Sequence, residues 1–484
     1  MKRLLLIIIV SCITSMGATA QQHEAAAISS SAISSSQTQQ PSTDQQIHHQ
    51  MPGMNMSETQ QPSKGPMLHL EDLEKIGLEN NPTLRQADAQ VRSTQGRQRQ
   101  AGLYPNPTVG YQGEQIRGGS FRGGEQGAFL QQDIVLGGKL GAARNVVEQE
   151  RKQAETEREE QQLRILSGIR LAYYQSLAAQ ETVALRSSLL KLAQDAVETS
   201  RQLFNVGQAD QPDVLQAEVE ADQAELALEA ALQNQQRMWK SLAAVAGKPD
   251  LPFSQLAGNL EDIPNIDTDE WLQKLLTDSP AVKIAQLGVA RAEAQVSRAR
   301  REPIPDLQLR GGIEQNRELM ESSNRPVGLQ GFAEIGIRIP LFNRNQGNIQ
   351  AAKADVERAQ LETKRVQLLL RQRLASTVQS YLTAKHSVDR YRNQMIPRAD
   401  KAYKLYLEKY NSMTAAYPQV LIAQRTLFQL RTDYVTALET LWMNSISLKG
   451  FMLTDGLEAP TSPAEMDRPI RETNLPIASS GPGK

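Results

Sequence analysis

The side chains best suited to chemistry gather near the N-terminus, where histidine and methionine stand close together. Four of the five histidines in the 484-residue chain precede residue 70. Thioether sulfur is a soft ligand that selects ions such as Cu(I), and imidazole binds copper and zinc. The sequence therefore predicts a metal-contacting segment with these candidate ligands: His48, His49, Met51, Met54 and Met56. The alternative interpretation is a low-complexity tail whose methionines have no role.

The same N-terminal region carries a signal for export. Two basic residues and the apolar run Leu4–Val10 precede the small-residue site Ala18-Thr-Ala20, which is the pattern of a signal peptide cleaved after Ala20. A rival interpretation places a lipid on Cys12, the only cysteine. In either case the mature chain is expected to form no disulfide.

Composition divides the remainder of the chain. Residues 21–67 are rich in Gln, Ser and Thr with little apolar content, and residues 453–484 carry repeated prolines. Both compositions are typical of disorder. The predicted organisation is a signal peptide over 1–20, a disordered tail over 21–67, a first repeat over 68–250, a linker over 251–266, a second repeat over 267–452 and a flexible tail over 453–484.

The most informative element is a strand that runs straight into a very long helix. Apolar residues alternate over 333–339, the period of a strand with one wet face. Pro340 cannot donate to a ladder, and residues 343–347 have turn chemistry. The Ala-, Gln- and Glu-rich sequence that follows predicts one helix over 347–411, about 97 Å long at 1.5 Å per residue.

The same strand-to-helix event occurs at residues 132–141, so the chain contains an internal duplication. Gly141 and Gly347 are 206 residues apart, and this spacing recurs between Val214 and Val420. A repeat of this kind decides the architecture and must be recognised before any fold is inferred.

The duplication predicts a fold that is mainly α with a small β part. Short helices are expected over 69–78, 83–102, 268–277 and 280–302, strands over 108–115, 126–135, 306–315 and 328–339, and long helices over 141–205, 213–246, 347–411 and from 419. The descent over 141–205 and the segmented return over 213–302 have equal lengths of about 100 Å. Matching lengths in the second copy predict that the N-terminal helices, residues 69–102, complete its return.

Four strands are too few for a closed membrane barrel, which needs about eight. An open sheet in lipid leaves backbone groups unpaired. Pooling strands among three copies predicts a trimer with a 12-strand β-barrel and a 12-helix α-barrel. A monomer with a soluble sheet is the alternative. Charge is balanced, with 53 basic and 54 acidic residues, which gives no electrostatic case for nucleic acid.

These features together resemble the TolC-type family of outer-membrane efflux proteins over roughly residues 68–452. The resemblance rests on the duplicated junctions, on Asn81-Pro82 and Ser279-Pro280 at the starts of the copies, and on the turns near 206–217 and 420–424. The form Asn343-Arg-Asn-Gln-Gly347 is most similar to the heavy-metal branch, whose members serve cobalt–zinc–cadmium and copper–silver pumps.

The resemblance implies a passive trimeric conduit in the outer membrane that extends into the periplasm. It would receive heavy-metal cations from a periplasmic adaptor protein and an inner-membrane pump of the resistance-nodulation-division type. Because the pump supplies the energy, neither a catalytic site nor a cofactor is expected, and no phosphate loop or nucleophile elbow occurs. Drug efflux and type I secretion are alternatives for the same conduit, and a periplasmic coiled-coil adaptor or scaffold is an alternative from another class.

The resemblance also implies that the two helix turns dock onto the adaptor. The candidate docking residues are Val206, Gly207, Gln208, Asp213, Val214, Met413 and Val420. Gln208 stands where the family usually has leucine, and Met413 takes a glycine position. The plainer interpretation is a pair of helix-hairpin turns with Asp213 as an N-cap.

Family members often close this tip with acidic rings from the second copy, where this chain has Gln419 and Ile422 instead. Asp210 and Asp213 of the first copy are therefore the candidate gate residues. Like charges crowded at a symmetry axis repel one another and attract cations. A solvated helix cap is the alternative for both carboxylates.

Overall fold

The computed structural model describes most of the chain between residues 67 and 459. The described ranges are 67–116, 124–207, 209–263, 266–319, 325–412, 414 and 417–459. All of them belong to one compact unit, residues 62–484. The predicted signal peptide, Cys12 and the candidate metal ligands, including His48 and Met51, lie outside the described residues.

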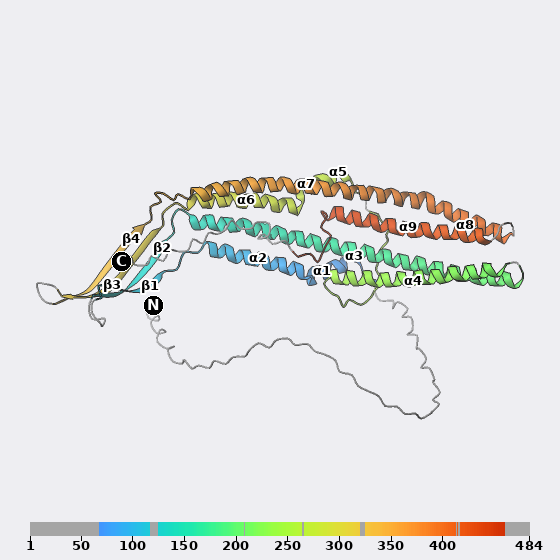
Figure 1. Cartoon of the computed structure of the whole chain (residues 1–484), viewed down its shortest axis with the longest axis horizontal. Coiled ribbons are helices and arrows are strands. Elements are labelled where there is room, and N and C mark those ends of the chain that lie inside the picture. The colour runs from blue at the N-terminus through green and yellow to red at the C-terminus, as the bar shows by residue number, and fades with distance from the viewer. Residues whose placement is uncertain are drawn as a thin grey trace, which may run out of the picture. The chain divides into compact units, whose positions relative to one another are not determined.

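A four-stranded antiparallel sheet stands at one end of the long helices (Figure 1). Its strands follow chain order: β1 Thr108–Glu114, β2 Glu125–Ile134, β3 Leu307–Leu319 and β4 Pro326–Ile337. Each strand pairs with the next, so β2 and β3 join the two sequence repeats. The predicted strands are confirmed to within two residues at most ends, although β3 continues four residues beyond its predicted end.

The sheet has one apolar face and one polar face because successive side chains point to opposite sides. The apolar face carries Val109, Leu130, Ile313, Leu329 and Ile335, all exposed. Ile335, for example, is 74% exposed. Soluble proteins rarely expose such a continuous row of large apolar side chains to water, so this face is expected to contact lipid or another protein.

Two long helical hairpins descend from the sheet. In the first repeat, α3 (Lys139–Asn205) is followed by α4 (Gln211–Val245), and α3 packs along α4. In the second repeat, α7 (Gln346–Arg390) and α8 (Ile396–Asn411) are followed by α9 (Tyr417–Lys449). None of the helices in the described ranges is both long and apolar enough to cross a lipid bilayer.

The second descent is not the single unbroken α-helix that the sequence predicted. A π-helical turn, Tyr391–Met395, separates α7 from α8. Pro397 lies just beyond this turn, and proline has no N–H and clashes with the carbonyl four residues earlier. Placing the wider turn before the proline lets the helix direction continue without that clash.

Four short helices complete the unit. They are α1 Leu70–Asn80, α2 Pro82–Ala101, α5 Thr268–Asp278 and α6 Pro280–Arg301. Asn81 and Ser279 precede the prolines that open α2 and α6, where a missing N–H costs nothing. The side chain of Asn81 also caps α2 by accepting a hydrogen bond from the N–H of Thr83 at 2.9 Å.

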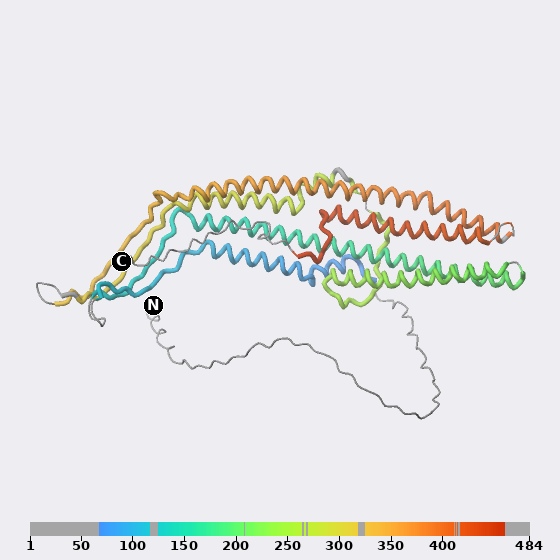
Figure 2. Tube along the Cα trace, in the orientation of Figure 1, coloured from blue at the N-terminus to red at the C-terminus, as the bar shows by residue number. Residues whose placement is uncertain are grey.

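The stacking of these short helices corrects one prediction. The α1–α2 pair runs in line with α4 of the first repeat, not with α9 of the second (Figure 2). Asn81 donates to the carbonyl of Val245, the last residue of α4, at 3.0 Å. In the second repeat, α6 and α9 both pack on α3 and α7. Length matching failed because α1–α2 and α5–α6 are duplicates of nearly equal length.

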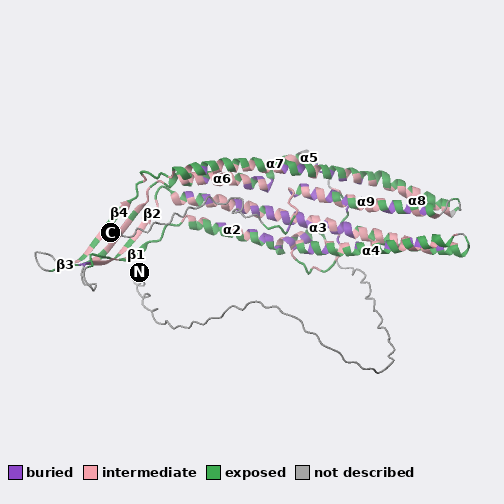
Figure 3. Cartoon of the chain, viewed as in Figure 1, coloured by how far each residue is buried: buried purple, intermediate pink, exposed green. Residues whose placement is uncertain are grey.

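The core lies halfway along the helices, where the short helices meet the long ones. Buried residues concentrate along α3 and α9, whereas the sheet is largely exposed or half-buried (Figure 3). Tyr174 stacks on Trp442 with 3.7 Å between ring centres. Gly168 lies so close to Gly456 that a Cβ on it would stand 2.9 Å from the Gly456 nitrogen, so the chain after α9 packs directly on α3.

The N-terminal half of α3 buries several polar side chains, and Glu157 is the one among them whose pKa is clearly shifted. Its side chain is 5% exposed. Burial raises the pKa of Glu157 from its ordinary value of 4.5 to about 8, with a further contribution from the neighbouring charge of Glu160. The native state therefore holds this carboxyl in its neutral form at neutral pH.

Glu157 should make the stability of the protein depend on pH. A raised native pKa adds stability that is complete below pH 4.5 and is lost as pH rises through about 8. Glu157→Gln mimics the neutral acid, so the variant should match the wild type at pH 5 and melt several degrees higher at pH 9. A chain of this size shifts its midpoint by about 1 °C per kcal/mol, and a pKa shift from 4.5 to about 8 corresponds to at most about 5 kcal/mol, so thermal unfolding in detergent can detect the difference. Glu155→Gln, on the half-buried side of the same helix, is the control, and parallel pH profiles for all three proteins would contradict the prediction.

Candidate functional site

The turn between α3 and α4 presents apolar and acidic side chains at the end of the helices away from the sheet. Val206 is 69% exposed, and Gly207 has φ of 73°, a left-handed conformation that favours glycine. Gln208 lies outside the described residues. Val214, on the first turn of α4, is half-buried.

The two acidic candidates of this turn form a helix cap whose order differs from the prediction. Asp210, not Asp213, is the N-cap of α4, and Asp213 is the third helical residue. The Asp213 carboxylate accepts a hydrogen bond from the Asp210 N–H at 3.3 Å, which is half of a capping box. Both residues therefore have a structural role as a helix cap, and both side chains remain exposed to solvent.

The turn between α8 and α9 differs from its counterpart. Met413 lies outside the described residues. Val420 is 2% exposed and therefore shapes the hairpin from inside, whereas the adjacent Ile422 is 63% exposed. Tyr410 and Tyr417 pack with 5.1 Å between ring centres. Burial, with the neighbouring Tyr410, raises the pKa of Tyr417 from its ordinary value of 10 to about 12.

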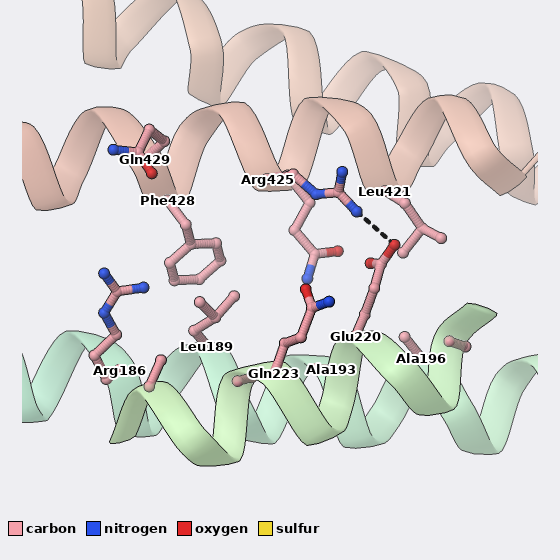
Figure 4. Close-up of a pocket in the computed structure, with 14 residues that line it drawn as sticks. Arg186, Leu189, Ala193, Ala196, Glu220, Gln223, Leu421, Arg425, Phe428 and Gln429 are labelled. Atoms are coloured by element: carbon pink, nitrogen blue, oxygen red, sulfur yellow. Dashed lines mark hydrogen bonds and ion pairs between the residues drawn. The ribbon is translucent and has the colours of Figure 1, made fainter. Parts of the chain in front are cut away.

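A groove of about 250 Å³ separates the two hairpins close to these turns. Figure 4 shows Phe428 of α9 facing Leu189 of α3 inside it. Arg425 of α9 crosses the groove and forms an ion pair with Glu220 of α4 at 2.6 Å. This ion pair connects the two hairpins within three helical turns of the N-termini of α4 and α9.

The Glu220–Arg425 pair was not identified from the sequence, although a signal for it exists. The two residues are 205 apart, and the repeat spacing is 206, so they occupy nearly the same level of the two hairpins. A search for opposite charges at the repeat spacing identifies them. Arg201 and Glu218, paired at 2.6 Å, form a comparable bond inside the first hairpin alone.

The strand-to-helix junctions are held by polar bonds, of which the first set joins the two repeats. Asp306, which leads into β3, accepts from the Leu136 N–H at 3.0 Å and pairs with Lys139 at 2.9 Å. Asn345 adopts φ of 58° before α7 and donates from its side chain to the Ala299 carbonyl at 2.8 Å. The Asn-Arg-Asn-Gln motif is therefore a structural turn that fixes α7 to α6.

The described residues contain no group of three or more His, Cys, Asp or Glu side chains that could hold a metal ion. The metal-contacting segment predicted at residues 48–56 lies outside them and stays a prediction. What the described chain offers is an elongated scaffold with an amphipathic sheet at one end and two adjacent helix turns at the other.

An open sheet with one apolar face, continued by paired helices about 100 Å long, defines the class of outer-membrane channel subunits that extend beyond the membrane. A family model described as "Outer membrane efflux protein" matches residues 75–248 and 271–452. The chain belongs to this family, whose model matches it in two separate segments.

Named relatives and solved structures agree with this assignment. The chain is 29% identical over 374 residues to the cobalt-zinc-cadmium resistance protein CzcC of Cupriavidus metallidurans, covering 77% of this chain and 87% of the relative. It is 27% identical over 295 residues to the nickel-cobalt-cadmium resistance protein NccC of Alcaligenes xylosoxydans, covering 59% and 64%. The crystal structure of CusC, described as forming a transmembrane channel, matches with a TM-score of 0.65 at 17% identity over 79% of this chain and 91% of that chain.

Membership defines the general role of the chain. It is an outer-membrane channel component of an efflux system, and the family consists of channel proteins rather than enzymes. Proteins of this family assemble as trimers and work with an adaptor and a pump.

The Glu220–Arg425 pair should help keep the two hairpins together. We expect Arg425→Glu, which sets two carboxylates against each other, to raise the fraction of time that the channel conducts in planar bilayers. The increase should be up to about fivefold, because an exposed ion pair contributes at most ~1 kcal/mol.

The matched control is Arg201→Glu, which reverses a charge of similar exposure inside one hairpin and should leave conduction unchanged. The charge swap Glu220→Arg with Arg425→Glu should restore the wild-type value. Equal effects of the two single reversals would show that the pair across the groove has no special role.

Proposed function

We propose that three copies of this chain form a closed conduit that passes heavy-metal cations out of the periplasm through the outer membrane. The observation that carries the assembly is the open sheet. In the described structure, β1 pairs only with β2 and β4 pairs only with β3, so both edges keep free N–H and C=O groups. Each such group costs several kcal/mol in lipid, which strand pairing between copies removes.

The two faces of the sheet support this closure. Membrane barrels alternate apolar residues toward lipid with polar residues toward the lumen. The exposed apolar face, with Val109, Ile313 and Leu329, fits the lipid side, and the polar face fits the lumen. Three sheets of four strands then make the twelve-strand barrel that the sequence predicted.

Exposed aliphatic side chains on the outer helices support the same assembly. On α7, Leu361 and Leu368 are exposed and lie seven residues apart. On α4, Val219 and Leu226 are exposed with the same spacing. These two helices are the outermost of the hairpins (Figure 1), so the stripe of one copy faces the next copy in a ring. Apolar residues every seven positions are the pattern of helices that pack side by side.

Two separate observations support metal cations as the substrate. The relatives CzcC and NccC are named for resistance to cobalt, zinc, nickel and cadmium. The segment 48–56 carries soft sulfur and imidazole ligands that suit copper or silver. The relatives point to divalent ions and the segment to monovalent ones. We therefore propose heavy-metal cations as the substrate class, and the growth experiment below identifies the ion.

The helix turns support docking onto a periplasmic adaptor that connects the conduit to an inner-membrane pump. Val206 and Ile422 offer exposed apolar side chains at the ends of neighbouring hairpins. Exposed large apolar side chains at the end of a scaffold are candidates for a protein-binding surface. Val420, which is buried, and Asp213, which is part of the α4 capping box, contribute to docking by fixing the conformation of the two turns. We retain the predicted domain division, with the repeats forming the conduit and both tails lying outside it.

Deletion of the gene tests the substrate. We expect the deletion strain to become sensitive to one or more of copper, silver, zinc, cobalt, cadmium and nickel, because efflux of that ion needs an outlet. Growth across these metals and a drug panel measures it. Complementation with a chain lacking residues 21–66 separates the metal segment from the conduit. Drug sensitivity with normal metal tolerance would retain the channel and overturn its substrate.

Photocrosslinking tests the docking turns. A photoreactive amino acid at Val206 should form an adduct in growing cells with a periplasmic adaptor, because this side chain projects from the turn. The same substitution at Lys240, exposed near the other end of α4, should give no such adduct. Mass spectrometry identifies the captured protein. Absence of an adaptor at Val206, or equal capture at both sites, would contradict docking through this turn.

A further inference from the structure

The polar face of the sheet holds one arginine in an unusual setting. Arg310 of β3 lies between two aromatic rings, its guanidinium carbon 4.4 Å from the ring centre of Phe129 and 5.8 Å from that of Phe332. Glu334 lies 3.8 Å away and the amide oxygen of Gln112 accepts a hydrogen bond from the guanidinium. All these residues share the polar face, since they occupy matching positions in the register.

The rings can lie flat because glycines stand beside them. At one level the four strands contribute Gly110, Phe129, Gly312 and Phe332, in that order. A Cβ on Gly110 would stand 2.5 Å from the Phe129 ring, and one on Gly312 would stand 2.7 Å from the Phe332 ring. Any larger residue at either position would push a ring outward from the sheet. The glycines therefore let both rings cover the sheet and flank the guanidinium.

The charge at this level is opposite to that of the rest of the face. Among the described strand residues, the polar face carries carboxylates at Glu114, Glu125, Asp133, Glu314 and Glu334, whereas Arg310 is its only cation. The face as a whole is acidic and attracts cations. The stacked rings and Glu334 hold the single positive charge against the sheet instead of letting it extend into solvent.

We propose that Arg310 is a selectivity-determining residue of the conduit. Three copies of the Phe129–Arg310–Phe332 stack form a ring of wall-fixed guanidinium groups inside an acidic lumen. This ring limits how strongly the lumen prefers cations. The inference rests on the proposed trimer, in which the polar face lines the lumen. The species that Arg310 discriminates are the permeating ions, small inorganic cations against small inorganic anions.

The size of the effect follows from Coulomb's law. In water a unit charge about 10 Å from a permeating ion changes its population by about twofold, and salt at 0.1 M screens charges over about 10 Å. Screening reduces each interaction to about a third, so removal of three guanidinium groups should raise the cation population and lower the anion population by about twofold each. The cation-to-anion permeability ratio should therefore rise about four- to fivefold. The effect should fade as the salt concentration increases.

The experiment measures reversal potentials of the purified full-length protein in planar bilayers under a KCl gradient. Arg310→Gln should increase the permeability ratio for K⁺ over Cl⁻, and Arg310→Lys, which keeps the charge, should stay close to the wild type. The matched control is Arg325→Gln, which removes an exposed arginine from the segment just before β4. Trimer formation on gels is verified for every variant.

A second variant tests the stack separately from the charge. The double substitution Phe129→Ala and Phe332→Ala keeps Arg310 but frees it from the wall, so the preference for K⁺ should fall below that of the wild type. A purely structural role of Arg310 would not give opposite shifts in the two variants. If Arg310→Gln fails to assemble, the double phenylalanine variant alone tests the proposal, because an unchanged permeability ratio in it would overturn the role of the stack.

The outcomes separate this inference from the function on which it rests. Absence of conducting steps from the wild-type protein would overturn the proposed conduit. Normal conduction with the same permeability ratio in the wild type, Arg310→Gln and the double phenylalanine variant would leave the conduit in place and overturn the role of Arg310.

Discussion

The backbone groups along the two edges of the sheet are the constraint on which the rest of the molecule depends. A strand edge in lipid has no water to bond, so four strands cannot stand alone there. The duplication supplies two hairpins, and β2 pairs with β3 to join them, but this still leaves β1 and β4 open. Closure between copies is the way to satisfy these edges. The long helices α3 and α7 inherit that ring geometry because they follow β2 and β4 along the chain.

That inheritance depends on the junctions, which convert a sheet spacing into a helix spacing. Strands lie about 4.8 Å apart and packed helices about 8–10 Å apart, so the chain must spread as it leaves the sheet. Asp306 ties the end of β2 and the start of α3 to β3, and Asn345 ties α7 to α6. These polar bonds fix the direction of each helix where packing is sparse. Halfway along the helices, the hydrophobic core around Trp442 and Tyr174 holds them together.

Much of this fold was predictable because it rests on periodicity. Alternation at 333–339 and the 206-residue repeat located β2, β4 and both helical hairpins. The π turn at Tyr391–Met395, the stacking of α1–α2 on α4 and the burial of Val420 were not predictable in the same way. Pro397 marks a break in the second long helix but does not say which kind of turn relieves it. The placement of α1–α2 depends on which of two similar helices they meet, and duplicated segments look alike to any argument from length. The burial of Val420 depends on packing that its own sequence position does not reveal. The Phe129–Arg310–Phe332 stack needed the register between strands, which one strand's pattern does not contain.

The placement of α1–α2 on α4 also changes what each repeat is. The first repeat holds its own short helices in line with its own return helix, and α6 of the second repeat lies with α9 between α3 and α7. Each half of the chain is therefore a complete unit of one strand hairpin and one helical hairpin. A ring of three such chains has the arrangement of six single-repeat subunits in which alternate boundaries are covalent. Duplication thus halves the number of separate chains that must meet, and it lets the two halves diverge, as the unlike turns at Val206 and Val420 already have.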